Sequence, residues 1–335
     1  MMDRRKLIGA MAAFTATLAA RAQVPGRVYR IGYLGATSPQ YDTPAETRIM
    51  DGLVFRLREL GFSEGGNTII ERRFADGRNE RYVDFAAEMV RKLNVDIVVA
   101  SNVAAVRGVM AASRTMPIVT MTGDPVQAGF AASLAHPGGQ VTGISNLGTD
   151  LIPKQLELLK AAVPTSRQIA IARCPDCLLK AGVSAAEVNA LSAEFDEAAR
   201  ALGLKLRYLM VNAKDDFDAV AAQLRREPPD ALLIGPTQIN QVLRDEWVAL
   251  AGDLRLPTLA LYPGFGAMLS YGADLVAIYR RAAEFVAKIL NGARPGDLPI
   301  EQPTKLELVI NLKVAKSIGF TVPPALLLRA DEVIR

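Results

Sequence analysis

Polar residues recur directly after predicted strands, where side chains could bind a small ligand. They comprise Thr37 and Ser38, Ser101 and Asn102, Thr122 with Asp124, and Gly235 with Thr237. Because the carboxyl ends of parallel strands form a crevice, these positions should converge. Free N–H groups at the N-termini of the following helices could bind a ligand carboxylate, and Asp124 could pair with a ligand ammonium group. Helix capping by Ser or Thr, and turn capping by Asp124, are the alternatives at these positions.

Catalytic signatures are poorly represented in the sequence. The only histidine is His136, which lies in a Pro/Gly-rich connection, so a Ser–His–Asp triad would depend on that one residue. The sequence has no G-x-S-x-G elbow, no P-loop and no G-x-G-x-x-G after the first predicted strand. We therefore expect a binding protein that is not an enzyme and has no cofactor.

Cys174 and Cys177 form a C-x-x-C motif after a predicted strand. Such a pair can be a redox centre, a short-loop disulfide or half of a zinc site. Zinc needs about four ligands, and the sequence offers no other cysteine, so we expect no metal site. A structural pair, oxidised or free, is favoured over a redox function. Tyr262 and Tyr271 lie near strand ends, where a ring could stack on a ligand or pack in the core.

Residues 1–22 have the pattern of a signal peptide. Arg4, Arg5 and Lys6 precede an apolar run that ends in Ala20-Arg21-Ala22, and the run is too short to span a bilayer. Sec and twin-arginine export are both compatible with it, and no cysteine suggests a lipid anchor, so we expect a soluble periplasmic protein. The segment carries a net charge of +3, which leaves about +1 of the total +4 for the rest of the chain. Nucleic-acid binding thus loses its main support.

From Val28 onward, short apolar strands alternate with amphipathic helices. Two successive series of this kind predict an α/β fold with two Rossmann-like lobes built on parallel sheets. The predicted strands are Val28–Leu34, Thr68–Phe74, Val95–Ala100, Pro117–Met121, Gln168–Ala172, Leu204–Met210, Asp230–Ile234 and Pro257–Leu261. Long helices are predicted over 185–202 and 274–290, and a further helix near 240–252. The segments 136–139 and 295–303 look like connections between the lobes.

Several motifs together resemble those of the TrpX-like ABC transporter substrate-binding proteins. They are Thr122–Val126, Ala131–Gly143, Leu269–Asp274, Tyr279–Ala283, Asp297–Lys313 and Arg329–Ile334. The resemblance implies a type I periplasmic-binding fold whose lobes close on a small ligand and are joined by a three-segment hinge. It places 28–145 plus 272–303 in an N-terminal lobe, and 146–271 plus 304–335 in a C-terminal lobe.

The resemblance also implies a cleft that binds an amino acid or an aromatic carboxylate. Carried over by position, the cleft includes the strand-end residues above and Tyr271. The loops at Cys174–Cys177 and Tyr262–Phe265 depart from the family pattern and are expected to face the ligand, which adds Cys174, Asp176 and Tyr262. The implied partner is an ABC permease in the inner membrane, and the protein is expected to be a monomer. A sensory receptor of the same fold and an exported redox protein are the alternatives.

Overall fold

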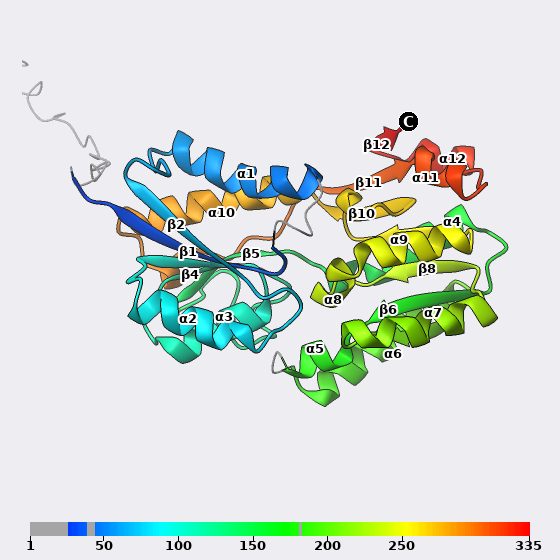
Figure 1. Ribbon diagram of the computed structural model, residues 1–335, viewed down its shortest axis with the longest axis horizontal. Helices are drawn as coiled ribbons and strands as arrows, with labels where there is room; N and C mark the ends of the chain where they lie inside the picture. Colours follow the sequence, from blue (N-terminus) through cyan, green and yellow to red (C-terminus); the bar gives the residue numbers. More distant parts are fainter. Residues whose placement is uncertain (1–25, 39–43, 181–182) are drawn as a thin grey trace, which may run out of the picture.

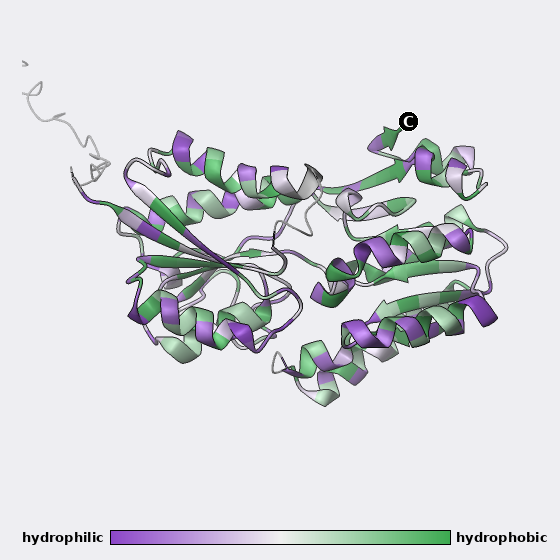
Figure 2. Cartoon of the chain, viewed as in Figure 1, coloured by the Kyte–Doolittle hydropathy of each residue, from purple (hydrophilic) through white to green (hydrophobic). Residues whose placement is uncertain are grey.

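A computed structural model describes residues 26–38, 44–180 and 183–335, which form two α/β lobes side by side (Figure 1). The predicted signal segment 1–22 lies outside the described residues. None of the helices in these ranges has the length and apolar composition needed to cross a bilayer. In both lobes apolar strands are enclosed by helices with polar outer faces (Figure 2). This arrangement explains why the strands read as nearly continuous apolar runs.

The first lobe contains a parallel five-stranded sheet with the order β2-β1-β3-β4-β5. Its strands are β1 (Tyr29–Gly35), β2 (Thr68–Phe74), β3 (Ile97–Ala100), β4 (Ile118–Thr122) and β5 (Val141–Ser145). Helices α2 (Arg81–Arg91) and α3 (Val103–Ala112) pack on one face through a core that includes Met89 and Val109. Helices α1 (Pro44–Glu59) and α10 (Leu275–Leu290) cover the other face, where Leu53 and Phe285 share one core with Ile31.

The second lobe contains a seven-stranded sheet with the order β12-β11-β10-β9-β8-β6-β7. Its strands are β6 (Gln168–Arg173), β7 (Lys205–Met210), β8 (Ala231–Ile234), β9 (Thr258–Ala260), β10 (Leu269–Ala273), β11 (Leu306–Asn311) and β12 (Glu332–Ile334). The β10–β11 pair is antiparallel and the other pairs are parallel. This follows from the connectivity, because β10 leads out towards the first lobe and β11 returns from it.

Helices cover both faces of the second sheet. They are α4 (Ile152–Ala162), α5 (Pro175–Lys180), α6 (Ala185–Ala201), α7 (Phe217–Arg226), α8 (Gln238–Val242), α9 (Arg244–Asp253), α11 (Leu312–Ser317) and α12 (Pro324–Leu327). Leu156 of α4 and Phe195 of α6 share a core with Ile171, whereas Leu224 of α7 and Trp247 of α9 pack with residues of the opposite face. The helix predicted near 240–252 is therefore two helices, which meet at Leu243.

The chain passes between the sheets after β5, between β10 and α10, and before β11. The predicted connection at 136–139 was wrong, because that segment stays within the first lobe. There Gly138 N–H donates to the Gly296 carbonyl at 3.1 Å, and Ile300 N–H donates to the Leu134 carbonyl at 2.7 Å. Glu301 then continues the first sheet beside β5, with hydrogen bonds to Gly143 and Ser145. The assignment of residues to the two lobes stays a prediction.

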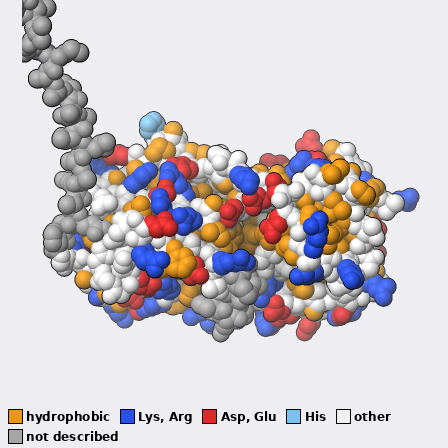
Figure 3. Space-filling view, turned by 90° about the horizontal axis from the view of Figure 1, so that it is seen from above, with side chains coloured by type: hydrophobic (Ala, Val, Ile, Leu, Met, Phe, Trp, Pro, Cys, Tyr) orange, Lys and Arg blue, Asp and Glu red, His pale blue; other side chains and the backbone are white. Residues whose placement is uncertain are grey.

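An ion-pair network joins α1, α10 and the segment at Glu301. Arg56 of α1 bonds Glu284 of α10 at 2.7 Å, and Arg281 of α10 donates two hydrogen bonds to Glu301, at 2.6 and 2.7 Å. The hydrogen bonds from Arg281 lower the pKa of Glu301. Figure 3, which looks down on this side of the molecule, shows basic and acidic side chains interspersed over it. Partly exposed pairs contribute little each, so the apolar core that α10 shares with α1 and the first sheet contributes most to its position.

Candidate functional site

A pocket of about 280 Å³ opens at the carboxyl edge of the first sheet and reaches the second lobe. Every strand of the first sheet contributes a residue within it or just after it, as expected for a crevice at the carboxyl ends of parallel strands. The lining residues are Tyr33, Ala36, Thr37, Thr47, Ile49, Met50, Asp51, Arg72, Phe74, Ser101, Met121, Asn146, Gln241, Tyr262, Leu275, Ile278 and Tyr279. Gln241 and Tyr262 come from the second lobe, so the pocket lies between the lobes.

Aromatic side chains from three elements form one wall of the pocket. The hydroxyl oxygens of Tyr33 in β1 and Tyr279 in α10 lie 2.8 Å apart and share a hydrogen bond. Phe74 of β2 meets the Tyr33 ring edge to face, with ring centroids 5.9 Å apart. Such a wall offers ring faces and one hydroxyl pair, which suits a planar apolar ligand group with a polar tip.

Two charged residues line the same pocket and differ in their surroundings. Arg72 donates to both carboxylate oxygens of Glu64, at 2.6 and 2.8 Å, and this pairing raises the pKa of Arg72. Asp51 of α1 is half-buried, and its carboxylate has no hydrogen bond or ion pair within the described part of the chain. The Arg72 charge is therefore compensated by protein, whereas the Asp51 charge is open to a ligand cation.

Three of the candidates from the sequence, Thr37, Ser101 and Tyr262, line the pocket. Ser101 follows β3 directly, and Thr37 and Tyr262 lie two residues beyond the ends of β1 and β9. Their role in ligand binding stays a prediction.

Other candidate residues form hydrogen bonds within the protein, as helix caps or a turn cap, and these bonds explain the residue types at their positions. The side chains of Asn102 and Thr237 cap α3 and α8, accepting from Ala105 N–H at 2.9 Å and Asn240 N–H at 3.3 Å. The exposed Asp124 accepts from Val126 and Gln127 N–H at 2.8 and 3.1 Å, so it caps its own turn. None of these three lines the pocket.

Four further candidates also lie outside the pocket lining. Ser38 donates its N–H to Asp76, and its buried hydroxyl has no partner among the described residues. Thr122 is 2% exposed, and its hydroxyl lies 3.4 Å from the Gly123 carbonyl. A β-carbon at Gly235 would lie 2.5 Å from the Ala172 carbonyl, so close strand packing accounts for that glycine. The Tyr271 carbonyl accepts from Gln155, and its ring packs against the core of the second lobe.

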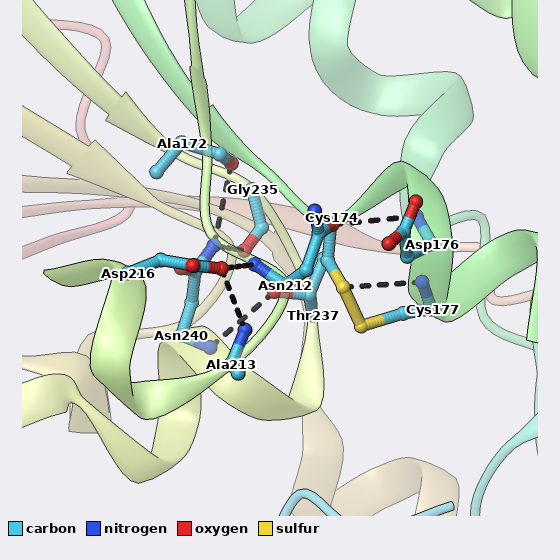
Figure 4. The surroundings of a disulfide bond; sticks show 10 residues. All are labelled: Ala172, Cys174, Asp176, Cys177, Asn212, Ala213, Asp216, Gly235, Thr237 and Asn240. Atoms are coloured by element: carbon cyan, nitrogen blue, oxygen red, sulfur yellow. Dashed lines mark hydrogen bonds between the residues drawn. A yellow bond between two sulfur atoms is a disulfide. The ribbon is translucent and has the colours of Figure 1, made fainter. Parts of the chain in front are cut away.

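Cys174 and Cys177 form a disulfide where β6 meets α5 (Figure 4). Cys174 is 2% exposed and belongs to a hydrophobic core, and the neighbouring Asp176 donates its N–H to Asn212. Within the described ranges, no group of three or more His, Cys, Asp or Glu side chains could hold a metal ion. Neither cysteine nor Asp176 lines the pocket, and the bond closes the turn after β6.

Reduction of this disulfide is expected to lower the free energy of unfolding by about 2 kcal/mol or less, because the closed loop is very short. Ligand affinity should change little, since neither sulfur lines the pocket. Denaturant unfolding with and without dithiothreitol, alongside a Cys174→Ser/Cys177→Ser variant, measures this. A dithiothreitol-dependent activity that Cys174→Ser abolishes would instead show a redox function.

Comparison with known proteins gives the family. Residues 40–334 match the profile described as ABC transporter substrate binding protein. The chain belongs to this family. The substrate-binding protein is 24% identical to the tyrosine-binding protein of Clostridioides difficile over 287 residues, which cover 82% of this chain and 77% of that protein.

Solved structures share the fold of this substrate-binding protein. A conserved domain protein from Vibrio cholerae is 25% identical, with a TM-score of 0.79 and coverage of 92% of this chain and 100% of that one. A domain from Streptococcus pneumoniae in complex with L-Trp is 23% identical, with a TM-score of 0.78 and the same coverage. The predicted type I periplasmic-binding fold with two α/β lobes is confirmed.

The substrate-binding protein has pocket residues that our candidate set omitted, among them Asp51, Arg72, Phe74 and Tyr279. Arg72 and Phe74 alternate along the end of β2, so they project from the same face of an edge strand. That alternation could have indicated from the sequence that Arg72 and Phe74 lie on the same side of the strand. Asp51 and Tyr279 lie within amphipathic helices, where a polar residue is indistinguishable in sequence from a solvent-facing one.

Proposed function

We propose that this chain is the extracytoplasmic solute-binding component of an ABC importer, and that it binds an amino acid with an aromatic side chain between its lobes. The observation that carries the proposal is the interlobe pocket, which combines an aromatic wall with the unpaired carboxylate of Asp51. Relatives that bind tyrosine or hold L-Trp support this ligand class.

Each part of such a ligand has a matching group in the pocket. The ring would pack against Tyr33, Phe74 and Tyr279, and the ammonium group would pair with Asp51. The carboxylate would accept hydrogen bonds from the hydroxyls of Thr37 and Ser101, which lie at the strand ends nearest the second lobe. This scheme moves the ammonium partner from Asp124, which caps its own turn, to Asp51.

The lobe assignment made from the sequence fits a hinge mechanism. In this proposal 28–145 plus 272–303 form one rigid lobe, and 146–271 plus 304–335 form the other. Gln241 and Tyr262 already line the pocket in this lobe arrangement, so movement about the crossing segments would open the pocket to admit the ligand and close it again with these two residues against the ligand. An ABC permease in the membrane would then receive the loaded monomer.

A thermal-shift screen on protein that has been denatured and refolded tests the ligand class. L-Tyrosine, L-tryptophan and L-phenylalanine should raise the melting temperature, since a ligand at 100 times its Kd adds about 2.7 kcal/mol to stability. L-Leucine and the deaminated acid 3-(4-hydroxyphenyl)propionate should give smaller shifts. Equal shifts for all five compounds, or none for any of them, would contradict the proposed ligand class. Uptake of labelled ligand by cells with and without the gene tests the importer role.

A further inference from the structure

A direct hydrogen bond spans the two lobes at one edge of the pocket. Gln238, the first residue of α8 in the second lobe, donates from Nε2 to the hydroxyl of Tyr82 at 3.3 Å. Tyr82 belongs to α2 of the first lobe. Neither residue lines the pocket, so this contact is separate from the ligand-binding surface.

The Tyr82 hydroxyl is also bonded to two strand ends that lead into the pocket. It donates to the Gly35 carbonyl at 2.8 Å and accepts from Asn102 Nδ2 at 2.6 Å. Gly35 directly precedes Ala36 and Thr37, and Asn102 directly follows Ser101, and all three of these neighbours line the pocket. One buried hydroxyl thus connects two walls of the pocket with the opposite lobe.

The hydrogen bond to the Gly35 carbonyl requires that the Tyr82 hydroxyl keep its proton. The Tyr82 side chain is 0% exposed, and burial raises its pKa. The hydroxyl therefore keeps its proton and can donate to the Gly35 carbonyl while it accepts from both amides. Separation of the lobes would break only the bond from Gln238, because the bonds to Gly35 and Asn102 lie within the first lobe. The interlobe bond therefore favours the juxtaposed lobes by the modest net free energy of one hydrogen bond.

A second contact beside Tyr82 supports the same lobe arrangement. A β-carbon at Gly77, in the loop after β2, would lie 3.6 Å from Val242 Cγ2 and 3.7 Å from Ile239 Cδ1 of α8. The loop is tied back to the pocket wall, because Asp76 N–H donates to the Ala36 carbonyl at 2.9 Å and Asp76 Oδ1 accepts from Ser38 N–H at 2.7 Å. Helix α8 therefore meets the first lobe through a hydrogen bond and also places two apolar side chains near the loop at Gly77.

We propose that Tyr82 and Gln238 form a latch that holds the lobes closed, and that Tyr82 is a positioning residue for ligand binding. The latch stabilises the closed form without touching the ligand. Because the apparent Kd equals the intrinsic Kd divided by the closed fraction, losing the latch weakens every ligand by the same factor. The expected effect on ligand affinity rests on the proposed function, whereas the expected effect on the closure of the lobes does not.

Two variants and a control isolate the latch. Tyr82→Phe removes the hydroxyl, and Gln238→Leu removes only the interlobe bond while leaving the bonds to Gly35 and Asn102. Tyr29→Phe, at a buried tyrosine in the core of the first lobe, is the matched control. The Kd values for L-tyrosine and L-tryptophan should both rise about two- to tenfold in each latch variant, with an unchanged ratio and a faster release. A change in that ratio, or no change beyond the control, would overturn the role of the latch in binding.

The lobe arrangement can be measured without any ligand. Spin labels at Gln127→Cys and Asp215→Cys, exposed positions on the two lobes, report the interlobe distance, and the native cysteines are held in the disulfide. The latch variants should shift the distance distribution towards longer values, and the double variant should shift it no further than Tyr82→Phe alone. Unchanged distributions in both single variants would refute the latch. Since this measurement needs no ligand, a failed amino-acid screen does not affect its outcome.

Discussion

The Asp51→Asn variant is expected to bind L-tyrosine or L-tryptophan about 10- to 100-fold more weakly than the unmodified protein, as for the loss of a charged hydrogen-bond partner. Asp51 is the only carboxylate among the described residues that line the pocket, and it has no partner there. The exchange removes the negative charge and keeps the size of the side chain. Isothermal titration calorimetry with each amino acid measures the loss directly.

Two controls test whether the loss of affinity in Asp51→Asn comes from the ligand ammonium group. Asp124→Asn should leave the affinity unchanged, because Asp124 caps its own turn and does not line the pocket. The deaminated acid 3-(4-hydroxyphenyl)propionate should bind Asp51→Asn at least as well as it binds the original protein, since it brings no cation. If Asp51→Asn weakens both compounds equally, Asp51 does not pair with the ligand ammonium.

The Gly143→Ala variant is expected to lose about 4 kcal/mol or more of unfolding free energy, a large part of the roughly 5–15 kcal/mol by which a protein of ordinary stability is folded. Gly143 lies in β5 with φ of +133°, a conformation that residues with a β-carbon rarely adopt. An added β-carbon would lie 2.7 Å from the Thr120 nitrogen and would clash with the carbonyl of the same residue in β4. Urea unfolding followed by circular dichroism measures the loss.

Gly129→Ala is the matched control for Gly143→Ala. Gly129 also has a positive φ, +74°, but nothing lies within 4 Å of the position its β-carbon would take. This variant should lose only the backbone cost of about 1–2 kcal/mol. Equal losses in the two variants would show that the close approach of β4 and β5 adds nothing to the cost at Gly143.

Apolar runs with turn signals predicted β1 to β4 and β6 to β9 from the sequence, because burial on both faces leaves a strong local pattern. The strands β5, β10, β11 and β12 were not found in this way. β10 and β11 pair with each other only after the chain has left for α10 and returned, and β11 runs antiparallel to β10 but parallel to β12. Pairing of this kind depends on tertiary contacts that no short window of sequence contains.

The candidate site was predictable only at the strand ends. Thr37, Ser101 and Tyr262 reach the pocket from such positions, but Asn102 and Thr237, in similar positions, serve as helix caps. The same residue types perform both tasks, so sequence alone does not separate them. Asp51 and Tyr279 enter the pocket because α1 and α10 pack side by side, although α10 is far from α1 in the chain.

The position of α10 has a consequence for synthesis on the ribosome. The five strands of the first sheet are complete at Ser145, yet α10, which covers the face around Ile31 together with α1, begins only at Leu275. During translation one face of the first sheet therefore lacks α10 until nearly the whole second lobe has emerged. The nascent chain must keep that apolar face soluble throughout this interval, so binding by a chaperone before completion is expected to be a normal step in its biogenesis.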